Sequence, residues 1–472
     1  MTGGIALARH DAMIRTLLAA TLLASAAALP AQVSPRDVDR LRDAALSDDY
    51  AWDITEGLTT EVGQRMAGTE AEARARAWSV AKLKAMGFAN VRVDPFTMPV
   101  WVRGAESASI VAPFPQKLVI AALGNSGSTP PGGLEGELVG FDTLADLEAA
   151  PDVAVRGKIV FVSHAMPRTE DGSGYGVFGG PRRQGPSVAS RKGAIAIVIR
   201  SIGTDYHRNP HSGNMSFAEG VRPIPAGALS LPDAEQMQRI LKRARGPVRM
   251  RLQLESTNLT DQRSGNVIAE VPGRDPSLAP ILVSGHLDSW DQGTGAIDDA
   301  TGVAIAAASA KRIMDAGRPM RTIRIVWFGA EEVGLFGGLD YRAKYGKQPH
   351  YAIMESDFGA DRIWKVDSRL GDARKDEALA IQLALQPLGI VPGALDRTEG
   401  SDIGPMVADG LPGVALNQDG TRYFDYHHTP DDTLDKVDPA QLRQNVAAWT
   451  AVLAILSGGI EPSAEPKRRG QR

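Results

Sequence analysis

The chain of 472 residues contains no cysteine, which excludes disulfide bonds and thiolate metal ligands. Any metal site must therefore use imidazole and carboxylate groups, a donor set that suits zinc or a related divalent ion. Histidine is scarce as well, with eight in the whole chain, so the adjacent pair His427 and His428 needs an explanation. Basic residues do not outnumber acids, and the formal net charge of −4 leaves no basic patch of the size that nucleic-acid binding requires.

Long apolar runs are rare, and the one that stands out lies at the N-terminus. The run TLLAATLLASAAALPA follows a basic lead that ends at Arg15, and the small residue Ala31 is suited to close a cleavage site. A membrane span needs about 20 apolar residues, and Pro30 cuts this run short. We therefore predict that residues 1–31 are a secretory signal peptide, with a buried helix or a membrane anchor as the alternative.

The predicted signal gives an expectation for location and leaves the start of translation open. Either Met1 or Met13 can begin the leader. The shorter form begins MIRTLL and places its basic residue, Arg15, directly before the apolar run, as is typical of a signal peptide. An exported protein without cysteine fits a bacterial periplasm or secretion from the cell. No later segment is apolar enough to cross a bilayer, so we expect no membrane span in the mature chain.

The pattern of apolar residues and loops changes twice along the remaining chain, which divides it into three parts and a polar end. Residues 32–115 hold two segments with helical apolar spacing and one extended segment. Over residues 116–255, short runs such as GKIVFVS alternate with loops such as RTEDGSGYGVFGGPRRQGP, which indicates an inserted β-rich domain. Residues 256–460 alternate strands and helices and resume the main domain, and the polar end, 461–472, is expected to be disordered.

The strands of the last large part are almost continuously apolar, as in PILVSGH, RTIRIVWFG, HYAIMES and PGVALN. Helical patterns such as GVAIAAASAKRIMDAG lie between them or follow them. This alternation is typical of a largely parallel sheet with helices on both faces. We therefore predict an α/β fold with a mostly parallel sheet flanked by helices, into which the β-rich domain is inserted.

Acidic and imidazole groups follow nearly every one of these strands. Functional groups in such sheets gather just beyond the carboxyl ends of the strands. The groups found there, and in the loop GTGAIDDATG, are His286, Asp288, Asp298, Asp299, Glu331, Glu332, Asp357, His427 and His428. Each alone is more often a cap, a surface group or part of a solvated helix start. Their occurrence at successive strand ends indicates a common site.

Two other motifs are incomplete, which leaves metal chemistry as the main hypothesis. The nucleotide-binding pattern G-x-G-x-x-G would need glycine where Asp298 stands, and a G-x-S-x-G nucleophile elbow is absent. Two divalent ions about 3.5–4 Å apart can clamp a water when one carboxylate bridges them and a further carboxylate takes the proton. The ligands available are His286, Asp298, Glu332, Asp357 and His428, and Glu331 is available as the base.

Four motifs in the same order carry a resemblance to a known family: SGHLDSWDQGTGAIDDATG, WFGAEEVGLFG, MESDFG and HHTPDDT. Together they resemble family 28 of the zinc metallopeptidases. The segments ASRKGAIAIVIRS and PHSGNM are similar to the plasma glutamate carboxypeptidase (carboxypeptidase Q) branch of that family. The resemblance covers nearly the whole mature chain, and residues 116–255 resemble a protease-associated (PA) domain inserted into a peptidase domain.

The resemblance implies a role for each group. His286 and Asp357 would bind one zinc, Glu332 and His428 the other, and Asp298 would bridge the two ions. His428 is the matching ligand because the family's histidine stands directly before T-x-x-D-T, here TPDDT.

The groups next to these ligands match supporting roles in the family. Glu331 matches the general base, and Asp288 matches the acid that orients the ring of a histidine ligand. The bond between the bridging aspartate and Asp299 is typically cis in the family. His427 is expected only to pack or form a hydrogen bond, and Asp432 to support the site without binding metal.

Four further residues are weaker candidates. Asp402 lies in a loop that the family often uses to contact substrate, and His211 belongs to the segment PHSGNM of the predicted insert. Tyr423 and Tyr426 each have a hydroxyl that suits oxyanion stabilisation, and the sequence does not choose between them.

The leading hypothesis is a secreted or periplasmic dinuclear zinc exopeptidase that hydrolyses dipeptides or short peptides, and the branch resemblance suggests a homodimer. The sequence does not decide between an aminopeptidase, a carboxypeptidase and a dipeptidase, nor does it give the side-chain specificity. Two alternatives are a catalytically inactive binding protein with the peptidase fold and a single-zinc acyltransferase similar to glutaminyl cyclases. The complete ligand set disfavours both.

Overall fold

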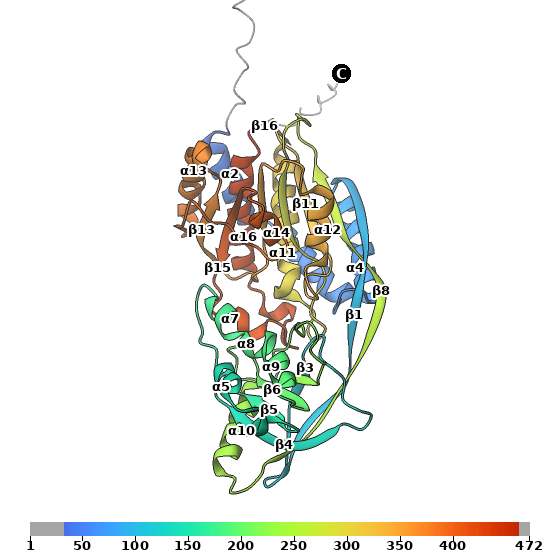
Figure 1. Ribbon diagram of the computed structural model, residues 1–472. Helices are drawn as coiled ribbons and strands as arrows, with labels where there is room; N and C mark the ends of the chain where they lie inside the picture. Colours follow the sequence, from blue (N-terminus) through green and yellow to red (C-terminus); the bar gives the residue numbers. More distant parts are fainter. Residues whose placement is uncertain (1–32, 462–472) are drawn as a thin grey trace, which may run out of the picture.

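The computed structural model describes residues 33–461 of the chain (Figure 1). The predicted signal peptide and, apart from Glu461, the predicted tail lie outside this range. Within it, no helix combines the length and apolarity that crossing a bilayer would require.

The main sheet contains four neighbouring strands that run parallel, in the order β15, β12, β9, β11. Antiparallel strands adjoin both sides of this block, with β8 next to β11 and β13 next to β15. The bounds are β8 Arg249–Val271, β9 Ile281–His286, β11 Ile323–Phe328, β12 Ala352–Glu355, β13 Ile363–Arg369, β14 Val391–Pro392 and β15 Gly413–Gln418. A separate pair joins β10 (Arg318–Pro319) to β16 (Ile460–Glu461).

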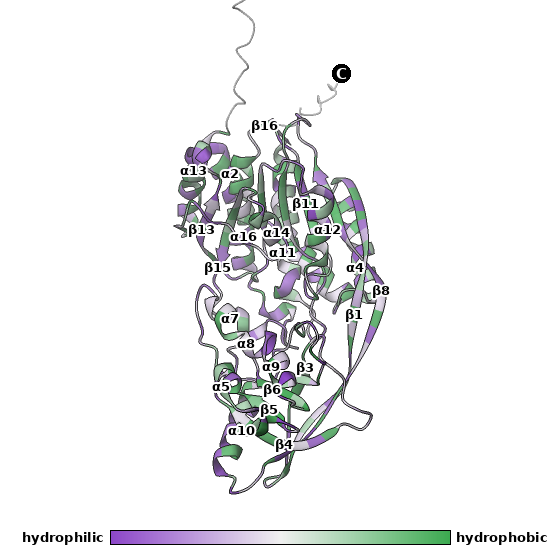
Figure 2. Ribbon diagram, viewed as in Figure 1, coloured by the Kyte–Doolittle hydropathy of each residue, from purple (hydrophilic) through white to green (hydrophobic). Residues whose placement is uncertain are grey.

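Helices cover both faces of this sheet, because its central strands are apolar on both sides (Figures 1 and 2). Side chains such as Val283 and Trp327 pack into the core under α2, α3, α11 and α16, whereas Leu282 and Phe328 pack against α12 and α14. The helices of this part are α2 Pro35–Ala45, α3 Tyr50–Gly57, α4 Glu70–Ala85, α11 Thr301–Ala316, α12 Phe336–Tyr345, α13 Lys375–Leu385, α14 Gly404–Ala408, α15 Tyr423–Tyr426 and α16 Pro439–Leu456. The predicted α/β class is confirmed.

Two long strands connect this sheet to the rest of the molecule. β1 (Ala89–Ala112) and β8 are antiparallel partners, from Ala89 opposite Glu270 to Ala112 opposite Arg249. One end of β8 pairs with β11, and the other end pairs with β4 (Leu134–Phe141). Figure 1 shows this ribbon running along one side of the molecule into the part that contains residues 116–255.

Residues 116–255 form a smaller layered unit, one face of which packs with part of β1 in an apolar cluster that includes Trp101, Phe161 and Met250. β4, β5, β6 and β7 are parallel neighbours, and β3 closes the sheet antiparallel to β7. The strands are β2 Gln116–Leu118, β3 Ile120–Ala122, β5 Ile159–Val162, β6 Ala196–Arg200 and β7 Ala226–Leu229. The helices are α5 Leu144–Ala149, α6 Asp152–Val155, α7 Ser173–Phe178, α8 Gly180–Arg183, α9 Gly185–Arg191 and α10 Leu231–Arg243.

The glycine-rich stretch from 168 to 186 differs from the sequence prediction, which made it a loop. It contains α7, α8 and the start of α9. Glycine and proline disfavour helix in isolation, so tertiary contacts must hold these short turns. Tyr175 of α7 stacks on Phe424 with ring centroids 4.5 Å apart, which ties the stretch to the C-terminal part of the chain.

Polar contacts also join this unit to the segment around α15. Arg168 donates to both carboxylate oxygens of Asp425, at 2.7 and 2.8 Å, and Asn209 donates to Asp431 at 2.6 Å. Asp205 lies in the same contact, only 6% exposed, and its Oδ2 is buried without a hydrogen-bond partner among the described residues. Burial, with a smaller contribution from the charges of Asp425 and Asp431, raises the pKa of Asp205 to about 7.

We expect Asp205→Asn to stabilise the protein at pH 8 and to have little effect at pH 4. The folded-state pKa lies above the ordinary value of 3.8, so the folded protein holds this proton longer than the unfolded chain and loses stability as pH rises from about 4 to 7. Allowing for screening by nearby water, asparagine should recover about 2 kcal/mol of unfolding free energy above pH 7. Urea unfolding of both proteins at the two pH values measures the difference; an equal gain at both would contradict the expectation.

Candidate metal centre

Three adjacent parallel strands end at one edge and deliver most of the predicted groups to it. His286 is the last residue of β9 and lies opposite Phe328, the last residue of β11. Glu331 and Glu332 follow β11 by a short turn, and Asp357 follows the next strand, β12, by two residues. The carboxyl ends of parallel strands share an edge, so side chains distant in the sequence meet there.

The five predicted ligands come together in two groups that share Asp298. In the first group, His286 Nε2 lies 3.1 Å from Asp298 Oδ1 and 3.2 Å from Asp357 Oδ1. In the second, His428 Nε2 lies 2.7 Å from Glu332 Oε2 and 3.3 Å from Asp298 Oδ2. The candidate ligand atoms of each group all lie within 4.8 Å of one another. One oxygen of Asp298 therefore faces each group, which is the geometry of a bridging carboxylate.

The buried acids of this cluster lack partners that a cation would supply. Glu332 Oε1 is buried without a hydrogen bond from any described residue, which is costly in a dry site. Asp298 Oδ2 also accepts no hydrogen bond, although the imidazole nitrogens of His427 and His428 lie 3.1 and 3.3 Å from it. Burial, together with the charge of Asp298, raises the pKa of Glu332, although His428 opposes the shift. Two imidazoles and three carboxylates in one cluster form an oxygen-rich donor set that fits zinc or a similar divalent ion.

The loop that carries Asp298 is held from two sides. Asp432 Oδ1 accepts hydrogen bonds from the amides of Ala296, at 2.7 Å, and Ile297, at 2.8 Å. Burial and the charge of Asp298 raise the pKa of Asp432 to about 7. The predicted supporting position of Asp432 agrees with these contacts.

Arg65, a residue that the sequence did not single out, braces the same loop. Its buried guanidinium donates to the carbonyl oxygens of Leu287 at 2.6 Å, Thr294 at 2.5 Å and Gly295 at 2.9 Å. An isolated arginine in the stretch GQRMAG carries no motif, so nothing in the sequence marks it.

The peptide bond between Asp298 and Asp299 is cis, as the family resemblance implied. Asp299 itself points away from the ligand groups. Its two oxygens accept hydrogen bonds from the amides of His286 and Gly302, each at 3.0 Å. Asp299 therefore ties the bridging loop to the end of β9 and to the start of α11.

Asp288 contacts the site through both its carboxylate and its main chain. Its carboxylate accepts hydrogen bonds from the amides of Glu331, at 3.1 Å, and Glu332, at 3.3 Å, and lies 3.7 Å from His286 Nδ1. The backbone carbonyl of Asp288, at 3.0 Å, is the closer partner of that ring nitrogen. The Asp288 carboxylate thus holds the backbone of the two glutamates and lies beside the histidine ring, and its role in orienting that ring stays a prediction.

Glu331 lies in a turn ahead of α12, so the alternative of a solvated helix start does not hold. Its side chain keeps partial exposure, whereas that of Glu332 is buried. Burial raises the pKa of Glu331 well above the usual range, and the charges of Asp357 and Glu332 add to this effect. A carboxylate in this position is suited to exchange a proton with a molecule bound at the cluster.

His427 lies closer to the cluster than a simple packing role requires. Its Nε2 is 3.1 Å from Asp298 Oδ2, and its ring stacks on that of His428 with centroids 3.7 Å apart. Tyr423 is buried, and its ring centroid lies 4.8 Å from that of His427. Tyr426 is half-buried, and its ring lies near the cations Arg422 and Lys436. Of the two candidate hydroxyl residues, Tyr423 is therefore the one that packs against the cluster.

Residues 116–255 also reach the cluster. Nitrogen atoms of His211, His427 and His428 lie within 4.8 Å of one another, so the weak candidate His211 belongs to the neighbourhood of the site. Tyr175, whose hydroxyl lies 3.3 Å from His211 Nε2, was missed because glycine-rich sequence surrounds it.

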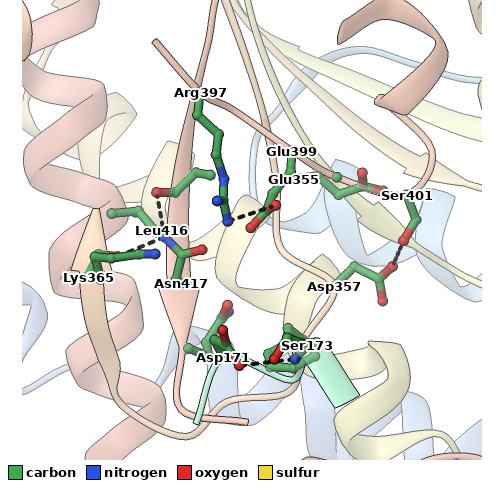
Figure 3. A pocket seen from close by; sticks show the side chains of 14 residues that line it. Asp171, Ser173, Glu355, Asp357, Lys365, Arg397, Glu399, Ser401, Leu416 and Asn417 are labelled. Atoms are coloured by element: carbon green, nitrogen blue, oxygen red, sulfur yellow. Dashed lines mark hydrogen bonds and ion pairs between the residues drawn. The ribbon is translucent and has the colours of Figure 1, made fainter. Parts of the chain in front are cut away.

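A cavity of about 510 Å³ opens beside Asp357 (Figure 3). Ser401 lines it and donates to Asp357 Oδ2 at 2.5 Å, and Arg397 and Glu399, which also line it, form an ion pair at 3.5 Å. Asp402, the predicted pocket residue, is fully buried instead and accepts a hydrogen bond from the Gly338 amide at 3.1 Å. The loop of Asp402 reaches the cavity, but its carboxylate faces away.

The chain is similar to known proteins over most of its length. The pattern of Peptidase family M28 matches residues 266–453. Carboxypeptidase Q of Bos taurus is 34% identical over 408 residues, which are 85% of this chain and 84% of that protein. The crystal structure of a peptidase M28 precursor from Shewanella amazonensis SB2B is 44% identical and superposes with a TM-score of 0.87 over 91% of this chain and 99% of that one. A match of this extent must include most of residues 116–255.

A more distant structure shows the same fold. BSAP, a zinc aminopeptidase from Bacillus subtilis, is 20% identical and superposes with a TM-score of 0.64 over 86% of this chain and 94% of that one. At this identity the likeness extends to the fold alone.

Proposed function

Because the chain belongs to peptidase family M28, we propose that it is a dinuclear zinc exopeptidase that hydrolyses dipeptides or short peptides. The observation that carries the proposal is the position of Asp298, with one oxygen toward His286 and Asp357 and the other toward Glu332 and His428. A second support is the pair of acids, Glu331 and Asp288, beside these groups.

In the proposed mechanism, two bound zinc ions would polarise the scissile carbonyl and make a water molecule acidic. Glu331 takes the proton of the attacking water and later delivers it to the leaving amine. Asp288 holds the backbone of Glu331 so that its carboxylate faces the cluster, and Tyr423 and His427 line the side where negative charge develops.

Two alternatives predict different metal contents. An inactive protein with the peptidase fold would be expected to have lost ligands, but all five predicted ligands converge. A single-zinc acyltransferase would hold about one ion per chain, whereas two ligand groups that share one carboxylate favour two ions. Metal analysis of the purified protein separates these possibilities.

The decisive experiment is a substrate panel, measured with and without a chelator and after zinc is restored. A dipeptide such as Ala-Ala should be cleaved, and the chelated enzyme should lose activity and regain it with zinc. An N-blocked dipeptide and a C-terminal amide separate the possible end preferences. Equal rates on free and N-blocked substrates would refute an aminopeptidase or dipeptidase, and activity that survives chelation would refute the metal mechanism.

We also propose the domain arrangement, location and assembly expected from the sequence. Residues 32–115 and 256–460 would form the peptidase domain and residues 116–255 a PA domain, a division supported by the parallel strands β4 to β7, which lie outside the parallel block of the main sheet. Export to the periplasm or medium should leave a mature N-terminus after residue 31, which N-terminal sequencing checks. Light scattering tests the proposed homodimer.

A further inference from the structure

The end of α10 and the start of β8 carry a dense group of cations. Residues 239–251 contain six basic residues and no acid, and all six are exposed: Arg239, Lys242, Arg243, Arg245, Arg249 and Arg251. The formal net charge of the whole chain, −4, conceals this local surplus. A group of this density attracts an anionic surface whatever the total charge of the chain.

Neighbouring acids neutralise only part of this charge. Arg239 lies 3.9 Å from Glu235, and Arg249 lies 2.9 Å from Glu135. We call residues 242–246, at the junction of α10 and β8, the basic turn. Its cations form no side-chain hydrogen bond or ion pair with any residue in the described range 33–461; they are Lys242, Arg243 and Arg245. These three side chains are therefore available to an external partner.

An exposed apolar segment, residues 111–115 (VAPFP), lies at the same end of the smaller unit. β1 and β8 are antiparallel, and Ala112 at the end of β1 is opposite Arg249 at the start of β8. Gln236 of α10 donates to Gln116 at 3.0 Å, which holds the residue after the segment against the helix. Phe114 is 43% exposed. This end of the molecule therefore combines free cations with an exposed apolar surface.

The basic turn lies away from the metal centre. Figure 1 shows the end of α10 and the start of β8 at the bottom of the molecule, opposite the chain termini. The smaller unit meets the centre through other residues, namely Tyr175 of α7, which stacks on Phe424, and His211. A partner bound at the basic turn thus leaves the metal centre uncovered.

We propose that the basic turn and the apolar segment dock onto an anionic membrane surface. The cations of the turn would contact the lipid phosphates, and Phe114 would enter the boundary between the headgroups and the acyl chains. A bilayer presents negative charge directly above apolar chains, and proteins bind it through basic clusters next to exposed apolar side chains. The inference does not rest on the exopeptidase function.

A nucleic acid also presents phosphates, but the composition of this end favours lipid. Proteins that bind single strands combine basic residues with several aromatic side chains on which successive bases stack. Residues 109–119 and 239–251 contain one aromatic residue, Phe114, which is flanked by Pro113 and Pro115. An apolar segment of this kind suits acyl chains better than bases.

The test is sedimentation of the mature protein with vesicles, made either of phosphatidylcholine alone or with phosphatidylglycerol added to about one third. The wild type should bind only the anionic vesicles, and raising the salt from about 0.05 to about 0.5 M should release it. Each basic residue near such a surface strengthens binding about fivefold, so replacing Lys242, Arg243 and Arg245 together by Gln should weaken it about 100-fold. Arg245→Gln alone should weaken it about fivefold.

A matched control changes the total charge by the same amount elsewhere. Arg36, Lys347 and Lys375 are exposed, and their side chains form no ion pair within the described residues. They belong to the main part of the molecule, and their joint replacement by Gln should leave vesicle binding within about twofold of the wild type. Both triple variants should hydrolyse Ala-Ala in vesicle-free solution at the wild-type rate, since neither set of residues lies in the metal centre.

The apolar contact has its own readout. Phe114→Ser should weaken binding to anionic vesicles about tenfold, the loss expected when a phenyl group no longer leaves water. In Phe114→Trp, brominated acyl chains should quench more fluorescence than in the wild type, whose own tryptophans provide the background.

Three results would overturn the proposal. They are equal binding of the wild type to both kinds of vesicle, an equal loss in the two triple variants, and capture of single-stranded DNA in preference to anionic vesicles. The last result would identify a nucleic acid as the partner. Vesicle binding is measured without substrate, so its failure leaves the peptidase function standing, and absence of peptide hydrolysis leaves the vesicle result standing.

Discussion

Glu331→Gln should lower kcat by at least about 10³-fold on any substrate of the panel, within the range that a lost general base costs. Glutamine has the same size but does not accept the proton of the attacking water. The backbone of residue 331 should stay in place, because its amide donates to Asp288, which the substitution does not alter. Steady-state kinetics measure the loss, and the zinc content should remain near that of the wild type.

Glu332→Gln is the informative comparison, since the two glutamates are neighbours with different expected roles. Its oxygen lies 2.7 Å from His428 Nε2 within the second ligand group, so this variant should lose metal as well as activity. If Glu331→Gln retained more than about a tenth of the wild-type kcat, the assignment of the base would be wrong. If it lost zinc, Glu331 would be a ligand instead.

Asp298→Ala should reduce the zinc content from about two ions per chain to well below one, because its two oxygens face both ligand groups. Activity should fall by more than about 100-fold, the upper end of the effect that loss of an outer partner of a metal ligand has. Metal analysis after dialysis against a fixed concentration of free zinc gives the stoichiometry.

The comparison variants distinguish a bridging ligand from a terminal one. Asp357→Ala and Glu332→Ala should each lose about one ion, since each belongs to a single group. Asp409→Ala, which removes an exposed partner of Arg342, should keep both ions. A loss of only one ion in Asp298→Ala would show that Asp298 does not bridge.

The sequence predicted the main sheet well, because its strands are short and apolar and lie between long helical patterns. It missed β13, whose run IWKVDSR mixes charged and apolar residues, and α12, whose start FGG contains two glycines. In both cases packing against the sheet outweighs local propensity. The prediction of a loop for the glycine-rich stretch with α7 and α8 was wrong because tertiary contacts, such as that of Tyr175 with Phe424, also outweigh local propensity there.

Within the site, the groups at strand ends were predictable because their position follows from the fold class. The residue that braces them was not, since Arg65 acts through backbone carbonyls and leaves no spacing pattern. The family resemblance assigned a role to the Asp288 carboxylate, but only the structure shows that it contacts the amides of Glu331 and Glu332.

The ribbon of β1 and β8 joins the two parts of the molecule through the backbone. β8 is hydrogen-bonded to β11 at one end and to β4 at the other, so the same strand belongs to the sheet of the metal centre and to the unit that contains His211. The two parts meet at His428, whose carbonyl accepts a hydrogen bond from the Ser212 amide, and His428 is only 8% exposed there. Under the proposed function, a folded protein would therefore not bring a peptide bond to His428, and we expect the substrate to be a short peptide or the free end of an unfolded chain.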